Sequence, residues 1–165
     1  MTREKNIKHD IIDFVVTGFY TGYFPFMPGT FGSLVGVFLF ILLSPLGIWF
    51  YLIWVMILCL AIPITTYAEK HIYASKDPQV IVIDEILGMM ATLFTFSFRG
   101  DIESWEFVIF GFLFFRLFDI TKPTPIASLQ KINGGFGVMI DDLFAAFYAN
   151  LLLQIIRFAP SLLPL

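Results

Sequence analysis

Residues 48–65 read IWFYLIWVMILCLAIPIT, an apolar run without a single charged side chain. A helix that crosses a bilayer needs about 20 mainly apolar residues, with a lower limit of about 17. This run reaches that length unaided, and it lies inside a longer stretch, Phe14–Ala68, that also lacks charged residues. The sequence therefore predicts a membrane-spanning helix here.

Two breaks rich in proline and glycine, Phe24–Gly32 and Ser44–Gly47, divide the uncharged stretch and set an aromatic N-terminal segment apart. The predicted apolar helices lie near Gly32–Leu43, Ile48–Thr65, Ile86–Phe98, Trp105–Phe118 and Leu143–Phe158. We therefore predict an all-α fold, an integral membrane helical bundle of about five apolar helices that forms a single domain over residues 1–165. The shorter runs are also compatible with core helices of a bundle that does not cross the bilayer.

The composition agrees with a lipid environment. The chain is 58% hydrophobic and 14% charged, with a mean hydropathy of +0.85. A soluble domain carries about 25% charged residues, so this chain has too few to cover a water-facing surface. The net charge of −3 argues against a nucleic-acid partner. A lone Cys59 excludes a disulfide framework, and the polar residues Met1–Asp10 are not followed by the pattern of a cleavable signal peptide.

The basic residues indicate an orientation. If the N-terminal Arg3, Lys5 and Lys8 are cytoplasmic, alternating helices place eight of the ten Lys and Arg residues inside, with only Arg99 and Arg157 outside. We therefore expect a multi-pass protein with five spans, or five partly inserted helices. The polar helix ends that carry the acidic residues Asp84, Glu85, Asp141 and Asp142 then lie on the cytoplasmic side.

Two acidic pairs occur in the same local pattern, Ile83-Asp84-Glu85-Ile86-Leu87 and Ile140-Asp141-Asp142-Leu143-Phe144. Each pair is predicted to begin an outgoing helix, where one acid could cap the free backbone N–H groups. Capping explains two adjacent acids poorly, because neighbouring carboxylates repel each other without a cation. Carboxylate oxygens suit Mg²⁺ or Mn²⁺, whereas the chain has only two histidines for zinc. The pairs therefore predict a hard-metal site.

A third charged element is Arg116-Leu117-Phe118-Asp119, followed by Lys122, Pro123 and Pro125. On a helix, Arg116 and Asp119 share one face, so a local salt bridge is one interpretation. The other is a phosphate site, in which Arg116 binds two phosphate oxygens and Lys122 acts as a point charge.

Two glycine-bearing segments complete the candidate residues. Met27–Leu34 leads into a predicted helix, where backbone N–H groups and the hydroxyls of Thr30 and Ser33 could bind an anion, or form an ordinary turn. Gly134–Gly137 precedes the second acidic pair and would let the chain fold tightly over the site, or form an ordinary flexible turn. In the connection between helices, Glu69 is a candidate to reach the site, whereas Lys70 and Asp77 are expected to be solvated.

These blocks resemble, in order, the signature blocks of the phosphatidylglycerophosphatase A family. The matching blocks are Pro28–Leu34, Asp84-Glu85 with Gly88-Met89, Phe115-Arg116 with Asp119, Lys122-Pro123 with Pro125-Ile126, and Gly134–Asp142. The resemblance covers about residues 28–147. It implies magnesium-dependent hydrolysis of the membrane phospholipid phosphatidylglycerophosphate to phosphatidylglycerol and phosphate, at the bacterial cytoplasmic membrane. It also implies an all-α fold in which several helices pack around a central one.

The residues and the resemblance together give a mechanistic hypothesis. The predicted Mg²⁺ ligands are Asp84, Glu85, Asp119, Asp141 and Asp142; the predicted substrate-binding residues are Thr30, Ser33, Arg116 and Lys122; and the predicted catalytic residues are Glu85, Asp119, Arg116 and Lys122. Glu85 is the expected base for the attacking water, with an aspartyl-phosphate as the alternative. A cation transporter or channel is the rival function, although its ion sites usually lie near the bilayer midplane. The sequence does not indicate an oligomeric state.

Overall fold

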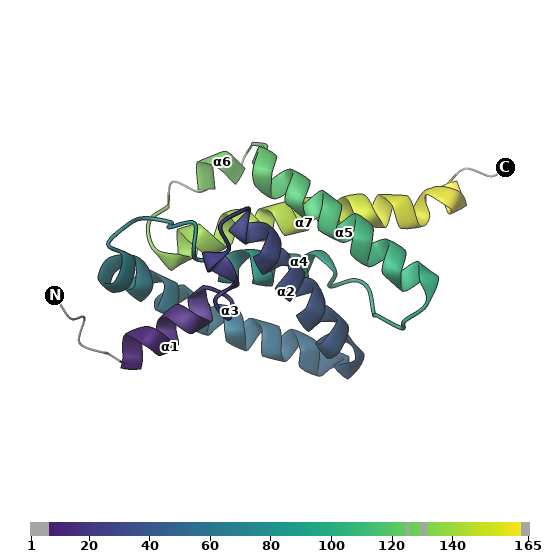
Figure 1. Ribbon diagram of the computed structural model, residues 1–165. Helices are drawn as coiled ribbons and strands as arrows, with labels where there is room; N and C mark the ends of the chain where they lie inside the picture. The colour runs from purple at the N-terminus through teal and green to yellow at the C-terminus, as the bar shows by residue number, and fades with distance from the viewer. Residues whose placement is uncertain (1–6, 125, 130–131, 163–165) are drawn as a thin grey trace.

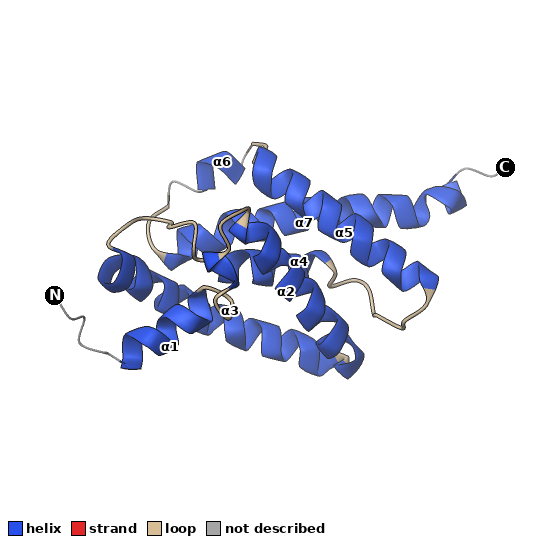
Figure 2. Ribbon diagram, in the orientation of Figure 1, coloured by secondary structure: helices blue, strands red, loops and turns tan. Residues whose placement is uncertain are grey.

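The computed structural model describes residues 7–124, 126–129 and 132–162, and within these ranges the chain is helical without any strand (Figures 1 and 2). The elements are α1 (Ile7–Val16), η1 (Thr21–Tyr23), α2 (Pro28–Leu43), η2 (Ser44–Leu46), α3 (Ile48–Ala68), η3 (Glu69–Tyr73), α4 (Ile83–Thr92), α5 (Ile102–Thr121), α6 (Ile126–Leu129) and α7 (Gly135–Leu162). The all-α prediction is therefore confirmed.

The short helix α4 is the most enclosed element. All but two of its residues are buried, and Leu87, Met89 and Met90 are at most 1% exposed. It contacts α2, α3, α5 and α7, which lie about it in Figure 1. A helix that is apolar on nearly every side needs such an enclosure, because no face of it can turn to water.

Glycines allow the neighbouring helices to approach α4 closely. A Cβ atom at Gly36 of α2 would lie 2.7 Å from the Ile86 carbonyl oxygen, and one at Gly88 of α4 would lie 2.8 Å from the Phe115 ring. Both distances are shorter than any normal contact, so a side chain at either position would force the helices apart. The glycines thus set the spacing of α2, α4 and α5.

Within the described part of the chain, three helices are long and apolar enough to cross a membrane: Pro28–Leu46, Ile48–Tyr73 and Gly135–Phe158. The predicted helix Ile86–Phe98 is wrong at both ends, since α4 starts at Ile83 and stops at Thr92. Ten residues give a helix of about 15 Å, half of the hydrocarbon thickness, so α4 is not a fifth full span. α5 has 20 residues but includes Glu103, Glu106, Arg116 and Asp119, and it is not among the three.

The other predicted helices form, but they extend beyond the apolar runs that predicted them. α2 begins at Pro28, so the glycine-bearing segment Met27–Leu34 is largely helical. α7 begins at Gly135, so Asp141 and Asp142 lie nearly two turns inside the helix and do not begin it. The prediction of a glycine turn over the site is therefore corrected: Gly135 lets α7 pack against α3, because a Cβ there would lie 2.1 Å from the Ile62 carbonyl oxygen.

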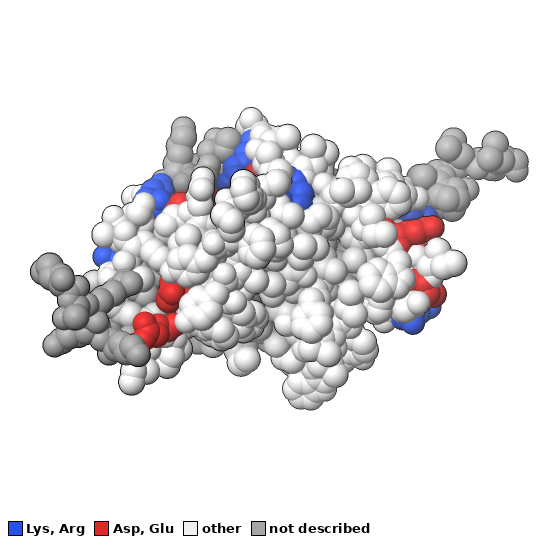
Figure 3. Space-filling model, viewed as in Figure 1, with Lys and Arg blue, Asp and Glu red and all other residues white. Residues whose placement is uncertain are grey.

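The helices run alternately between two ends of the molecule. The first, which we call the site end, holds the start of α2, the start of α4 and the C-terminus of α5. The far end holds η2 and the connection before α5, joined by a hydrogen bond from the Phe98 N–H to the Ser44 hydroxyl. Figure 3 shows a broad uncharged surface that separates two groups of charged side chains. Exposed apolar side chains from α2, α3 and α5, such as Phe38, Met56 and Leu113, fit a lipid-facing band.

Candidate active site

A cleft of about 430 Å³ opens at the site end. It is lined by Met27, Pro28, Gly29, Asp77, Gln79, Ile81, Asp84, Glu85, Arg116, Asp119, Ile120, Lys122, Asp141 and Asp142. Four helices therefore contribute: the start of α2, the start of α4, the last turn of α5 with the residue after it, and the second turn of α7. The two acidic pairs and the third charged element, far apart in the sequence, share one cavity.

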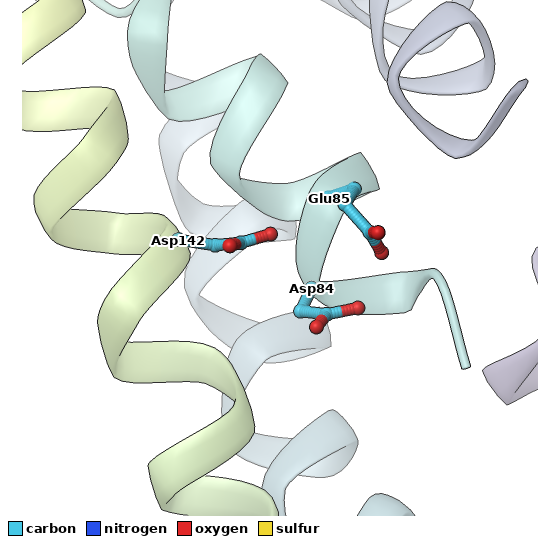
Figure 4. Close-up of side chains that lie close together, drawn as sticks. All are labelled: Asp84, Glu85 and Asp142. Atoms are coloured by element: carbon cyan, nitrogen blue, oxygen red, sulfur yellow. The ribbon is translucent and has the colours of Figure 1, made fainter. Parts of the chain in front are cut away.

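Three carboxylates form the centre of this cleft. Asp84 and Glu85 project from the first turn of α4, and Asp142 projects toward them from α7 (Figure 4). Each contributes an oxygen, and these oxygens all lie within 4.8 Å of one another. Gly88 makes the approach possible, since a Cβ there would lie 3.2 Å from the Asp142 Cβ. Asp84 is 8% exposed and Asp142 only 3%.

The carboxylates are not satisfied by the protein. Asp84 Oδ1, Glu85 Oε2, Asp141 Oδ1 and Asp142 Oδ2 are buried without a hydrogen-bond partner among the residues that the structure describes. Unpaired buried carboxylates are costly unless a cation or a proton neutralises them. A set of convergent carboxylate oxygens is the donor set that Mg²⁺ prefers, so these residues fit a magnesium ion.

The carboxylates of α4 are easier to protonate than exposed ones. Burial raises the pKa of Asp84 well above its usual value, and the negative charge of Glu85 adds to the effect. Burial is also the main reason why the pKa of Glu85 rises from 4.5 to about 8, and the charges of Asp142 and Asp119 raise it further. Without a cation, the cluster is therefore expected to hold protons near neutral pH.

Two cations border the carboxylate cluster. Arg116 Nη1 lies 2.6 Å from Asp119 Oδ2, so the salt bridge expected for residues three apart on one helix face is present. Lys122 Nζ lies 2.5 Å from Asp141 Oδ2, a contact that joins the end of α5 to α7. Burial opposes the charge on Lys122, but the hydrogen bond and negative charge of Asp141 outweigh it and raise the pKa of Lys122. The cleft thus combines unpaired carboxylates with two fixed cations.

The N-terminus of α2 faces the same cleft. A Cβ atom at Gly29 would lie 2.2 Å from Glu85 Oε1 and 3.1 Å from Arg116 Nη1, so a side chain there would displace the Glu85 carboxylate from its observed position. The positive end of the helix dipole favours an anion at this position.

A family model described as phosphatidylglycerophosphatase A matches residues 14–157, most of the chain and all of the cleft. The chain belongs to the phosphatidylglycerophosphatase A family. The resemblance of the sequence blocks to this family is thereby confirmed.

Individual relatives agree with the family match. Proteins named phosphatidylglycerophosphatase A from Haemophilus influenzae and Escherichia coli are 37% and 34% identical to this chain, over 89% and 79% of it and 89% and 74% of their own lengths. A protein of Bacteroides thetaiotaomicron, whose name gives it provisionally as a phosphatidylinositol-3-phosphatase, is 33% identical over 86% of this chain and 90% of its own length. No solved structure matches the chain.

The five acids predicted as metal ligands in this phosphatidylglycerophosphatase A family member all line the cleft, in two settings. Asp84, Glu85 and Asp142 form the unpaired cluster, whereas Asp119 and Asp141 are bound to Arg116 and Lys122. The ligand roles of all five stay predictions.

The two hydroxyls predicted to bind an anion belong to residues that do not line the cleft. Ser33 is fully buried, and its hydroxyl donates a hydrogen bond to the Gly29 carbonyl and lies 3.5 Å from Arg116 Nη1. Thr30 Oγ1 is buried and lacks a hydrogen-bond partner within the described residues. Substrate contact by Thr30 and Ser33 stays a prediction, and of the two hydroxyls it is that of Ser33 that contacts Arg116.

Two acids of the connection before α4 are less solvated than the sequence suggested. Asp77 is partly buried and lines the cleft, although it was expected to be solvated. Glu69, the candidate to reach the site, is 6% exposed but is not among the residues that line the cleft; it accepts a hydrogen bond from the Asp77 N–H. In the sequence, the only indication that these two acids lie near the site is that their segment leads directly into Asp84.

Proposed function

We propose that this protein is a magnesium-dependent phosphatase that hydrolyses phosphatidylglycerophosphate to phosphatidylglycerol and phosphate, a step of phospholipid synthesis. The observation that carries the proposal is the joint position of three unpaired carboxylates and two fixed cations in one cleft. The family match and the names of the two phosphatidylglycerophosphatase A relatives support the substrate.

The carboxylates would hold the magnesium ion. Asp84, Glu85 and Asp142 are the proposed ligands, because their oxygens converge and lack other partners among the described residues. When bound, a magnesium ion neutralises phosphate oxygens and lowers the pKa of a water molecule. Asp119 and Asp141 would instead hold Arg116 and Lys122 at the border of the cluster.

The two cations would bind the phosphate. Arg116 offers a planar set of donors to two phosphate oxygens, and Lys122 offers a point charge from the other element. In the resting cleft both cations are paired with carboxylates, so the phosphate replaces or shares those partners as it binds. Fixed cations then stabilise the charge that develops on the phosphoryl oxygens in the transition state.

Glu85 is the proposed base. It is the most exposed of the three clustered carboxylates and lies beside Arg116, where the phosphate is expected. Its carboxylate accepts a proton from the attacking water while the new bond from water oxygen to phosphorus forms. The bond between phosphorus and the glycerol oxygen breaks, and the proton that Glu85 accepted is passed on to that oxygen, which leaves as the lipid alcohol. An aspartyl-phosphate route is the alternative.

The rim of the cleft suits a lipid substrate. Met27 and Ile120 line the cleft and are 61% and 62% exposed, so the polar site opens directly onto apolar side chains. We propose that the acyl chains pass over this rim while the head group reaches the carboxylates. The site end would face the cytoplasm, because the expected orientation puts the cytoplasmic connections, with eight of the ten Lys and Arg residues, on the side of the acidic pairs.

The direct test is phosphate release from phosphatidylglycerophosphate in detergent micelles, with Mg²⁺ or with EDTA. Wild-type protein is expected to release phosphate only with Mg²⁺, and Asp142→Asn is expected to lose at least about 100-fold in rate, because it removes a proposed metal ligand. Glu103→Gln, an exposed carboxylate at the far end, is the matched control and should keep full activity.

Phosphatidylinositol 3-phosphate is the second substrate in the same assay, because one relative carries that name. Faster phosphate release from this lipid would mean that the protein is a phosphatase whose preferred substrate is phosphatidylinositol 3-phosphate. Folded wild-type protein that releases no phosphate from either lipid at any Mg²⁺ concentration would overturn the proposal. Cation flux in liposomes would then test the transporter alternative.

A further inference from the structure

Asp77 is a carboxylate of the cleft that the proposed mechanism does not use. It lies in the segment between η3 and α4, is partly buried, and lines the cleft together with Asp84 and Asp141. Asp77 therefore shares one cavity with the carboxylate cluster.

Glu69 fixes the backbone of Asp77. Glu69 is 6% exposed, and its Oε1 accepts a hydrogen bond of 2.7 Å from the Asp77 N–H. Its carbonyl oxygen accepts a second bond, of 3.1 Å, from the Ser75 N–H. One residue thus binds two positions of the turn that carries Asp77. A buried carboxylate that accepts from a backbone N–H makes a charge-assisted bond, roughly twice as strong as a neutral one.

The turn needs this support because of its backbone conformation. Ala74 has a φ of 49° and Asp77 a φ of 47°, in the left-handed region that side chains other than glycine rarely adopt. Such residues persist where the surroundings hold them, and they are frequent at functional sites. Loss of the Glu69 carboxylate would remove the hydrogen bond that holds the Asp77 backbone in this conformation.

The rest of the segment is also held in place. The Val82 N–H donates to the Val16 carbonyl at 3.0 Å, and a Cβ atom at Gly22 would lie 1.9 Å from the Val80 carbonyl oxygen. The chain from Val80 to Asp84 is therefore packed against the N-terminal part of the molecule. The Glu69 hydrogen bond holds Asp77, three residues before this packed segment begins.

We propose that Asp77 is a further carboxylate of the acidic site, which helps to hold the divalent cation, and that Glu69 is the residue that positions it. This inference rests on the proposed magnesium site. A magnesium ion in a protein usually keeps several bound water molecules. A carboxylate beside the cluster can therefore accept hydrogen bonds from these water molecules. Glu69 itself lines a separate cavity with Lys70, Ser75 and Lys76, so its proposed influence on the site passes through the turn that carries Asp77.

The test is the apparent affinity for Mg²⁺, measured from the rise in thermal midpoint of the detergent-solubilised full chain during a Mg²⁺ titration. Asp77→Asn is expected to weaken this affinity about tenfold, the usual loss for a supporting residue of a metal site. Glu69→Ala should weaken it several-fold, and Glu69→Gln should stay near wild type because its amide oxygen still accepts the Asp77 N–H. Lys70→Gln is the control, since Lys70 is exposed, adjoins Glu69 and lines the same outer cavity.

A double variant separates positioning from general damage. If Glu69 acts through Asp77, Glu69→Ala combined with Asp77→Asn binds Mg²⁺ as weakly as Asp77→Asn alone. Wild-type Mg²⁺ affinity in Asp77→Asn overturns the inference, and additive losses in the double variant overturn the role of Glu69. If Glu69→Ala does not fold, Asp77→Asn and Glu69→Gln decide the matter. Phosphate release by the wild type is measured in parallel, so failure of the proposed function is recognised independently of the Mg²⁺ titration.

Discussion

At the scale of single residues, the carboxylate cluster links protonation, metal binding and stability. Asp84, Glu85 and Asp142 lie within a few ångströms of one another, and each has an oxygen without a hydrogen-bond partner among the described residues. A cluster of this kind is stable either with protons or with a cation. The stability of the folded protein should therefore depend on both pH and Mg²⁺, and Glu85 is one of the groups responsible.

The pKa of Glu85 predicts the direction of this dependence. Between 4.5 and about 8, the folded protein holds a proton that the unfolded chain releases, so its stability falls as pH rises through this window. Magnesium must displace that proton, so its affinity should rise over the same window. We expect the thermal midpoint in EDTA to fall with rising pH, and the increase on adding Mg²⁺ to grow. Both trends should be weaker in Glu85→Gln. Equal trends in the wild type and in this variant would show that Glu85 does not cause the pH dependence.

The residue scale also shows which contacts can be predicted from sequence. Arg116 and Asp119 are three residues apart on one helix, so their salt bridge follows from local geometry. The contact of Lys122 with Asp141 depends on how the end of α5 packs against α7, and no local sequence pattern predicts that packing. Asp77 was missed for the same reason: its proximity to the cleft comes from the Glu69 contact and not from its sequence neighbours.

At the scale of elements, the apolar runs predicted the helices but not their ends. α4 stops at Thr92 although apolar residues continue to Phe98. The Asn150 side chain on α7 donates hydrogen bonds to the Thr92 carbonyl and to the Thr95 hydroxyl, and the first of these satisfies a backbone carbonyl that a longer helix would have paired internally. This cap is 58 residues away in sequence from Thr92. The apolar run therefore predicted burial correctly and helix length incorrectly.

Close packing at Gly88 gives the prediction for this scale. In Gly88→Ala, the new methyl group would meet the buried Phe115 ring at 2.8 Å and the Asp142 Cβ at 3.2 Å. We expect a loss of about 1–3 kcal/mol in stability, the usual cost of overpacking a core. Activity should fall further than stability explains, because Asp142 is displaced from Asp84. Thermal unfolding and phosphate release measure the two effects.

Gly111→Ala is the matched control for Gly88→Ala. Its methyl group would meet mainly the ends of the Leu93 and Leu153 side chains, at 2.8 Å and 3.3 Å, and these can rotate away. Gly111 lies on α5 away from the carboxylates, so activity per folded molecule should stay unchanged. If Gly88→Ala and Gly111→Ala lose stability and activity equally, close packing at Gly88 has no special role in placing Asp142.

At the scale of the whole molecule, the polar cleft meets an apolar surface. Replacing the exposed rim residues Met27 and Ile120 with serine should reduce hydrolysis of long-chain phosphatidylglycerophosphate, because the acyl chains lose apolar contact area. Hydrolysis of a short-chain, water-soluble analogue should be unchanged, since the head-group contacts remain. An equal loss on both substrates would show that Met27 and Ile120 support the cleft itself. Leu42→Ser, exposed at the other end of α2, is the control.

The single cysteine offers a test of how the molecule lies in the membrane. Cys59 is exposed on α3, in the middle of a helix long and apolar enough to cross the bilayer. A membrane-impermeant maleimide does not enter the hydrocarbon layer, so Cys59 should resist this reagent until the protein is denatured. In a Cys59→Ser background, Asp101→Cys at the far end should react in intact cells, and Lys70→Cys at the site end only after permeabilisation. The reverse pattern would place the carboxylate cleft on the outer face, and rapid labelling of Cys59 in membranes would mean that α3 does not span the bilayer.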